Sequence, residues 1–206
     1  MSNAARRRAR RSSKEPAPIS QLHEVVVIIG DAFGADPACV EAAVLLESAG
    51  RLLGYDLTVR PVSFLAEDER TNRLAIFGEK AAKLLPPEAL AQAHDTRPLG
   101  QEETGHVIVT CEDPAWLFDP NLRQLGAFGI KAPSAAMPIN SVSDDGGWTF
   151  RHDGLTVRYL LDESSRGLLK NHREVSRMFE QDAIDVVRHV RAGGTANDYP
   201  RPTALA

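Results

Sequence analysis

The stretch from Asp36 to Arg60 constrains the fold most, because it reads as a helix that leads directly into a strand. Asp36 and Pro37 are residue types that favour the N-cap and the first helical position. Gly54 suits the C-cap before the strand. This assignment places Cys39 in the first helical turn, where free backbone N–H groups and the helix dipole favour a thiolate. The stretch therefore predicts a reactive cysteine at the start of a buried helix.

Composition and charge indicate one globular domain in a reducing compartment. The chain has 206 residues, of which 43% are hydrophobic and 25% charged, enough for a single core. A net charge of -4 argues against nucleic acid as the main partner. Two cysteines, Cys39 and Cys111, do not make a disulfide framework, so a cytoplasmic setting is expected. No apolar run approaches a membrane-spanning length, and no membrane partner is expected.

The chain divides into three parts by composition. Residues 1–20 are rich in Arg, Ser and Pro and are expected to form a disordered basic N-terminal arm. This arm is either a solvated tail or a weak electrostatic contact for an acidic partner or nucleic acid. Residues 21–192 are expected to form the folded domain. Residues 193–206 follow a Gly-Gly pair and are expected to be a loose C-terminal tail.

Local patterns predict a mixture of helices and strands. Helices are expected at 36–54, 72–85 and 88–94, over 163–191 with a break near Asn171, and at 21–33, where a strand pattern competes. Strands are expected at 55–65 (with Pro61 at an edge or bulge), 105–111, 115–119, 148–150 and 155–161. The last four strands form two hairpins, through Asp113-Pro114 and Asp153-Gly154. Residues 96–104 and 121–140 are expected to be mainly loop.

Three polar residues lie where folding could bring them together. His106 starts a strand, and Asp119 ends the next strand of the same hairpin. Neighbouring antiparallel strands place side chains of one face in contact. If the Cys39 helix packs on this sheet, the three residues supply a nucleophile, a base and an acid that orients the base. Each also has a structural explanation, as a small core cysteine, a satisfied strand histidine and a strand-ending aspartate.

Gln124 follows Asp119 closely and has two interpretations. Its amide could stabilise an oxyanion together with the backbone N–H of Cys39, or it could face solvent from a loop. The five histidines other than His106 are scattered without ligand spacing, and two distant cysteines do not make a zinc motif. No metal and no cofactor are expected.

These motifs resemble the transglutaminase-like branch of the papain-like cysteine peptidase superfamily. The matching motifs are Cys39 at a helix start, Gly54-Tyr55 before a strand, 105–109, and 116–120. The resemblance covers about residues 22–125 and implies an α+β papain-like core, in which the helix bearing the Cys packs on an antiparallel sheet bearing His and Asp. It also implies a Cys39–His106–Asp119 triad. Asn121 departs from the family's Asp-Pro-Thr motif.

The residues and the resemblance together predict a thiol-dependent hydrolase, a peptidase or amidase. It would act on a peptide or amide substrate through a thioester intermediate. One alternative is an acyltransferase or a protein-modifying enzyme of the transglutaminase or deamidase type on the same triad. Another is a non-catalytic binding protein that keeps the fold. The sequence does not identify the substrate, and it leaves open whether residues 66–104 cover the active site.

Overall fold

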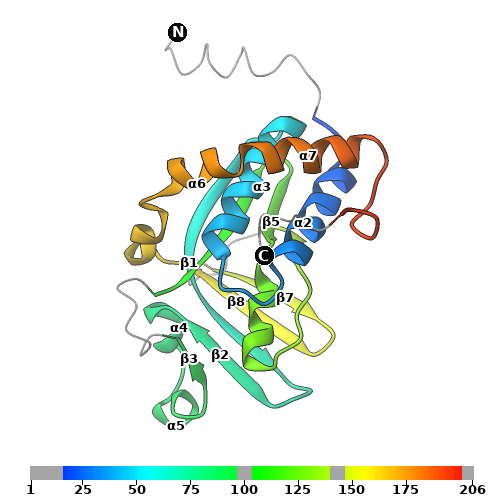
Figure 1. Ribbon diagram of the computed structural model, residues 1–206. Helices are drawn as coiled ribbons and strands as arrows, with labels where there is room; N and C mark the ends of the chain where they lie inside the picture. Colours follow the sequence, from blue (N-terminus) through cyan, green and yellow to red (C-terminus); the bar gives the residue numbers. More distant parts are fainter. Residues whose placement is uncertain (1–15, 97–103, 140–146, 201–206) are drawn as a thin grey trace.

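The computed structural model describes residues 16–96, 104–139 and 147–200, which form a mixed α+β architecture with a mostly antiparallel open sheet (Figure 1). The helical elements are α2 (Ile19–Phe33), α3 (Cys39–Leu53), α4 (Glu79–Ala82), α5 (Pro87–Leu90), η2 (Leu122–Phe128), η3 (Glu163–Leu169), α6 (His172–Met178) and α7 (Glu180–Arg191). The strands are β1 (Leu57–Asp68), β2 (Arg73–Phe77), β3 (His94–Asp95), β4 (His106–Glu112), β5 (Ala115–Asp119), β6 (Ala135–Pro138), β7 (Gly147–His152) and β8 (Leu155–Leu161). None of the helices in these ranges is long and apolar enough to cross a membrane.

The long strand β1 organises the sheet, whose main order is β3-β2-β1-β4-β5-β6. The first half of β1 pairs with β4, from Leu57 opposite Cys111 to Val62 opposite His106. Its second half pairs with β2 and with β8, and β8 carries β7. Pro61 lies one residue before the pairing with β8 begins, so its missing N–H falls where that pairing does not need it.

Residues 72–85 and 88–94 differ from the prediction of two helices. The first segment forms strand β2 followed by the single turn α4, and the second forms the single turn α5 followed by the start of β3. Ala75 and Phe77 are buried, and Phe77 stacks on Phe64 of β1 at a ring-centroid distance of 4.3 Å. Pairing with an available edge of β1 therefore overrides local helical preference.

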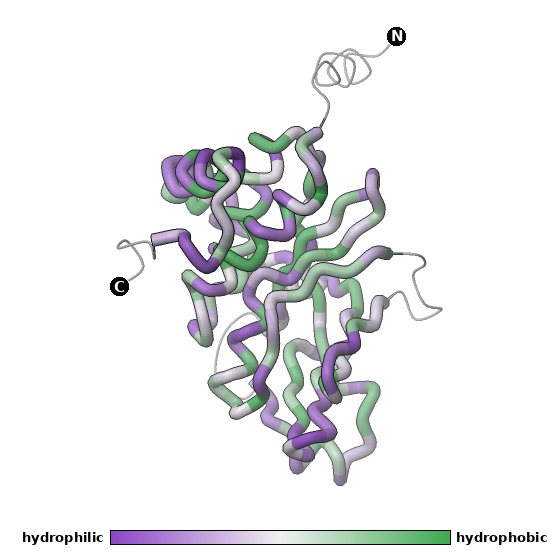
Figure 2. The backbone as a smooth tube through the Cα atoms, turned by 90° about the vertical axis from the view of Figure 1, so that its right-hand side faces the viewer, coloured by the Kyte–Doolittle hydropathy of each residue, from purple (hydrophilic) through white to green (hydrophobic). Residues whose placement is uncertain are grey.

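Three helices form one layer over the sheet. In Figure 1, α2, α3 and α7 lie together on one side, and α3 packs on β1 and β4. Their shared core is apolar and includes Val107 and Val109 from β4 and Phe118 from β5. The hydropathy colouring of Figure 2 shows hydrophobic segments running along the strands, while turns at the far end of the sheet are hydrophilic.

A second core lies on the other face of β4 and β5. Because side chains alternate along a strand, Ile108 and Leu117 point away from the first core and pack in the second. Phe64 and Tyr159 belong to the same cluster. His106 contacts this cluster, with its ring centroid 4.8 Å from that of Phe64. The start of β4 therefore places a titratable ring against an apolar wall.

Both ends of the described chain are attached to the helices. The backbone N–H of Ala17 donates to Leu53, and the Tyr55 hydroxyl donates to the carbonyl of Ala17. The backbone N–H of Ala196 donates to Glu24 at 3.0 Å, and Tyr199 packs edge-on against His189. Residues 16–20 and 195–199 therefore belong to the folded unit, while residues 1–15 and 201–206 of the expected arm and tail lie outside the described residues.

Gly30 on α2 marks the closest approach between the helix layer and the segment that follows β5. A Cβ atom at Gly30 would lie 2.8 Å from the Pro120 carbonyl oxygen and even closer to the Ser134 hydroxyl. We predict that Gly30→Ala lowers the free energy of unfolding by about 1–3 kcal/mol, although alanine is the better helix former by about 1 kcal/mol. Urea denaturation would measure this difference.

Gly126→Ala is the control for that prediction, because a Cβ there would meet only Ala35 at 3.4 Å, an ordinary contact distance. A Gly30→Ala protein as stable as the wild type would contradict the close packing between α2 and the Pro120 segment.

Candidate active site

Cys39 is the first residue of α3, two positions earlier in the helix than predicted. Ala38 takes the N-cap position, and no side chain caps the helix. Asp36 is not the N-cap, because its backbone is used in a turn: its N–H donates to Phe33, and its carbonyl accepts from Ala38 and from the Asn121 side chain. The predicted C-cap at Gly54 is confirmed, in the left-handed conformation. At the first helical position the backbone N–H of Cys39 has no intrahelical acceptor and is free to bind an anion.

His106 and Asp119 are joined as the hairpin predicts. Val109 pairs with Phe118 at the end of the β4–β5 ladder, so Asp119 lies one residue beyond this pair and diagonally across from His106 on the same face. Both side chains are fully buried, and His106 Nε2 lies 2.9 Å from Asp119 Oδ2. The carboxylate therefore accepts from Nε2–H and leaves Nδ1 as the nitrogen that faces the remainder of the site.

Asp119 has two further donors that the sequence patterns did not reveal. The Tyr159 hydroxyl donates to Oδ2 at 2.9 Å, and the backbone N–H of Asn121 donates to Oδ1 at 3.1 Å. Burial and the charge of Asp119 raise the pKa of Tyr159 well above its ordinary value, so the hydroxyl keeps its proton and remains a donor. Strand alternation predicts that Tyr159 is buried but not that β8 aims it at Asp119.

The electrostatics of His106 are set by opposing effects. Burial disfavours the charged ring and lowers its pKa, whereas the charge and hydrogen bond of Asp119 raise it. A side-chain hydrogen bond with Cys39 and the charge of that thiol raise it further, and the net result is a pKa of about 10. His106 is therefore an imidazolium at neutral pH, with Asp119 on one side and Cys39 on the other.

Gln124 is buried and contacts the triad, so its interpretation as a solvent-facing loop residue is wrong. Its Nε2 atom lies 2.7 Å from His106 Nδ1. Because the charged ring carries a proton on Nδ1, the amide oxygen of Gln124 takes this position in the imidazolium and accepts from Nδ1–H. The first turn of η2 places the amide there.

The four predicted residues thus meet at one place, supported by α3, β4, β5 and η2. The second cysteine is elsewhere: Cys111 is buried, its thiol donates to the Asp113 carbonyl at 3.3 Å, and burial raises its pKa. Over the described ranges, no group of three or more His, Cys, Asp or Glu side chains is arranged to hold a metal ion.

No family model, curated protein or solved structure matches this chain. The resemblance to transglutaminase-like peptidases therefore rests on the sequence motifs, and it remains a prediction beside the geometry described above.

The raised pKa of His106 predicts how the unfolding free energy of the protein depends on pH. Because its folded pKa of about 10 exceeds the ordinary value of 6.5, the charged ring stabilises the folded state. This contribution is complete below about pH 6.5 and is lost as the pH rises through the folded value. We expect unfolding free energy to fall between these limits, by at most about 1.4 kcal/mol per pH unit from this group.

Urea denaturation across that range would measure the fall, and an NMR titration of the ring would assign it to His106. In Asp119→Asn the main stabilising charge is gone, so burial dominates and the ring should titrate at lower pH than in the wild type. A His106 ring that titrates at an ordinary value in both proteins would contradict the buried ion pair.

Tyr159 is predicted to position Asp119. In Tyr159→Phe the carboxylate loses a donor, and we expect a loss of about 2 kcal/mol in unfolding free energy. Because the imidazole is then less firmly oriented, alkylation of Cys39 by iodoacetamide should slow several-fold and its pH profile should shift. Mass spectrometry of the labelled peptide would measure the rate.

Tyr55→Phe is the matched control, since it removes a buried hydroxyl that donates to the Ala17 carbonyl, outside the triad. This variant should lose stability without a change in Cys39 labelling. Equal labelling rates in both variants would assign Tyr159 a purely structural role.

Proposed function

We propose that this protein is a thiol-dependent hydrolase that cleaves a peptide or amide bond through Cys39, His106 and Asp119. The observation that carries the proposal is the buried His106–Asp119 pair, whose ring also interacts with the Cys39 thiol. The two ring nitrogens of His106 contact Asp119 and Gln124, and the ring also interacts with the Cys39 thiol, so the residues of a catalytic site surround one imidazole. The order nucleophile, base and acid is that of cysteine acyl chemistry.

The proposed reaction follows from the resting charges. A cationic imidazole beside the thiol is the partner that a thiolate requires. The Cys39 sulfur attacks the carbonyl carbon, and the oxygen becomes an anion that the backbone N–H of Cys39 and the amide of Gln124 are placed to stabilise. When the C–N bond breaks, His106 gives its Nδ1 proton to the departing amine, which leaves a thioester.

Hydrolysis completes the cycle. His106, now neutral, takes a proton from water as the water oxygen attacks the thioester carbonyl. The Cys39 thiolate leaves, the carboxylic acid is released, and His106 is again an imidazolium. Asp119 keeps Nε2 protonated throughout, so that Nδ1 is the nitrogen that exchanges protons. Transfer of the acyl group to an amine is the alternative reaction on the same triad, and a papain-like core of the transglutaminase-like branch is the proposed framework.

The first test is the pH dependence of iodoacetamide alkylation, read separately at Cys39 and Cys111 by mass spectrometry. We expect Cys39 to be alkylated faster than Cys111 at neutral pH, because its thiol lies beside the His106 ring. His106→Ala should abolish this difference in rate. Cys111 serves as an internal control within the same molecule, since it is buried and its pKa is raised.

A second test asks for the acyl-enzyme itself. p-Nitrophenyl acetate should release nitrophenolate in a burst equal to the protein concentration and add one acetyl group to Cys39. In Gln124→Ala, alkylation should slow several-fold because Nδ1 of His106 loses a neighbour, while acyl transfer should fall further, by about 10²-fold, if the amide also serves the oxyanion. Slow, His106-independent labelling together with no burst would overturn the hydrolase proposal in favour of a binding protein.

A further inference from the structure

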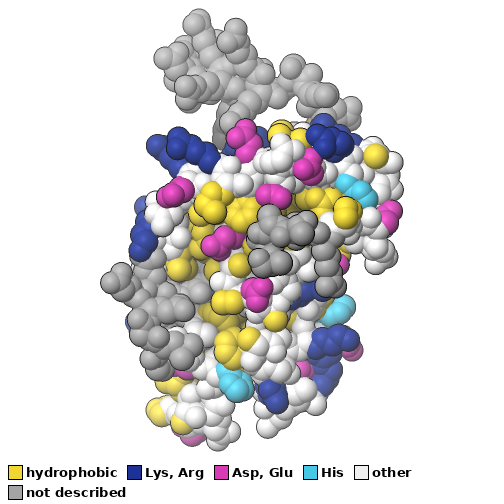
Figure 3. Space-filling model, viewed as in Figure 1, with side chains coloured by type: hydrophobic (Ala, Val, Ile, Leu, Met, Phe, Trp, Pro, Cys, Tyr) yellow, Lys and Arg dark blue, Asp and Glu magenta, His cyan; other side chains and the backbone are white. Residues whose placement is uncertain are grey.

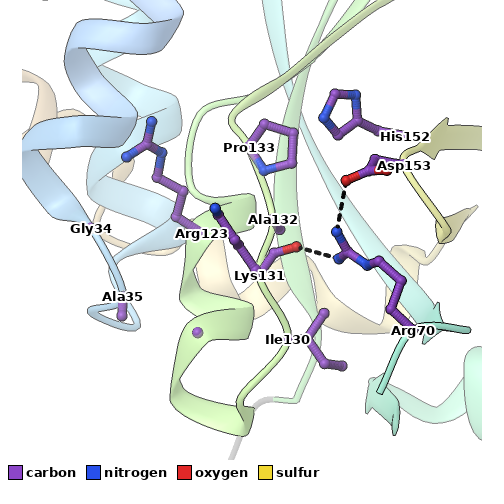
Figure 4. Close-up of a pocket in the computed structure, with 11 residues that line it drawn as sticks. Gly34, Ala35, Arg70, Arg123, Ile130, Lys131, Ala132, Pro133, His152 and Asp153 are labelled. Atoms are coloured by element: carbon purple, nitrogen blue, oxygen red, sulfur yellow. Dashed lines mark hydrogen bonds and ion pairs between the residues drawn. The ribbon is translucent and has the colours of Figure 1, made fainter. Parts of the chain in front are cut away.

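A second polar site lies in a surface pocket that contains none of the triad residues. The pocket has a volume of about 510 Å³, within the usual size range of small-molecule sites. Gly34 and Ala35 form one wall, Arg123 and Lys131 a second, and Arg70 and His152 a third (Figure 4). In Figure 3, Lys, Arg and His side chains gather at the lower right of the molecule, over the region of the β7–β8 hairpin in Figure 1.

Arg70 builds the frame of the pocket. Its Nε donates to Asp68 at 2.8 Å, Nη1 to Asp153 at 3.0 Å and Nη2 to the Lys131 carbonyl at 3.1 Å. It thereby joins the β1–β2 turn, the β7–β8 turn and the segment before β6. Because each nitrogen of this guanidinium has an acceptor, Arg70 fixes the position of the Lys131 backbone, and only the second N–H groups of Nη1 and Nη2 remain for a ligand.

Lys131 and Arg123 retain free donors. Lys131 is exposed, and its ammonium group forms no ion pair with any residue in the described ranges. Arg123 pairs with Asp31 through Nη1, and its Nη2 has no acceptor there either. Figure 4 draws the Lys131 side chain pointing toward Arg123, whose guanidinium lies beside α2. Ammonium and guanidinium groups bind carboxylate or phosphate oxygens by charge-assisted hydrogen bonds.

Two segments that line the pocket also carry residues of the triad region. Ala35 precedes Cys39 by four residues, so their Cα atoms are at most about 14 Å apart. Arg123 is next to Gln124 in η2, and the Asn121 amide ties that element to the Asp36 carbonyl at 3.2 Å. The loop before α3 and the 3-10 helix η2 therefore contribute residues to both sites.

We propose that this cationic pocket binds the carboxylate or phosphate group of a small anionic ligand. Lys131 supplies the main charge, Arg123 Nη2 a second donor, and Ala132 and Pro133 a nonpolar lining for the remainder of the ligand. The binding does not require the triad to be catalytic, so it stands or falls separately from the hydrolase proposal.

The test is an NMR titration of the wild-type protein with succinate and, separately, with inorganic phosphate, at constant ionic strength. We expect saturable shifts of the Ala35, Gly126 and Lys131 amides with at least one of the two probes. The stronger probe identifies the group as carboxylate or phosphate. Lys131→Gln should weaken its binding about tenfold, and Lys131→Arg should retain it.

Lys83→Gln is the matched control, because Lys83 is an exposed lysine at the end of α4 and does not line the pocket. It should leave the dissociation constant unchanged, and unchanged cross-peaks away from the pocket in Lys131→Gln will show that this variant is folded. Absence of saturable shifts with both probes, or equal weakening by Lys83→Gln and Lys131→Gln, would overturn the proposal.

Discussion

The buried pair of His106 and Asp119 is the interaction on which the site depends. Two ionised groups in a protein interior are costly unless they are close together and their remaining polar atoms are satisfied. The fold meets this requirement from several directions, because Asp119 also accepts from the Tyr159 hydroxyl and from the Asn121 backbone. The β4–β5 hairpin, β8 and the start of η2 are therefore tied to one carboxylate. Removing either charge would leave the other buried and unpaired, at a cost of about 3–5 kcal/mol.

The position of the Cys39 thiol is set separately, by the packing of α3 on the sheet. The interior of α3 is rich in alanine, with Ala42, Ala43 and Ala49 all fully buried against the neighbouring elements. Small residues allow α3 to pack closely on β1 and β4. Its first residue then lies beside the first residue of β4, so Cys39 and His106 meet at the end of the helix–sheet interface. The catalytic proposal therefore depends on a contact between two element termini, without any long loop.

The elements around the triad also form part of the wall of the cationic pocket. The turn at residues 34–38 leads into α3 and is tied to Asn121, while η2 carries both Gln124 and Arg123. A movement of this turn or of η2 would therefore displace residues of both the triad and the cationic pocket.

Local sequence determined a large part of this protein. Alternation and turn residues located both hairpins, Gly54 ended α3, and the hairpin of His106 and Asp119 placed an acid beside a base because residues of one strand face recur every two positions. Tertiary structure decided the remainder. β2 replaced an expected helix because β1 offered an edge to pair with, and Asp36 gave up the N-cap because its backbone is held in a turn. Tyr159 reached Asp119 from 40 residues away, since such a contact depends on how strands pair across the sheet and not on any pattern along the chain.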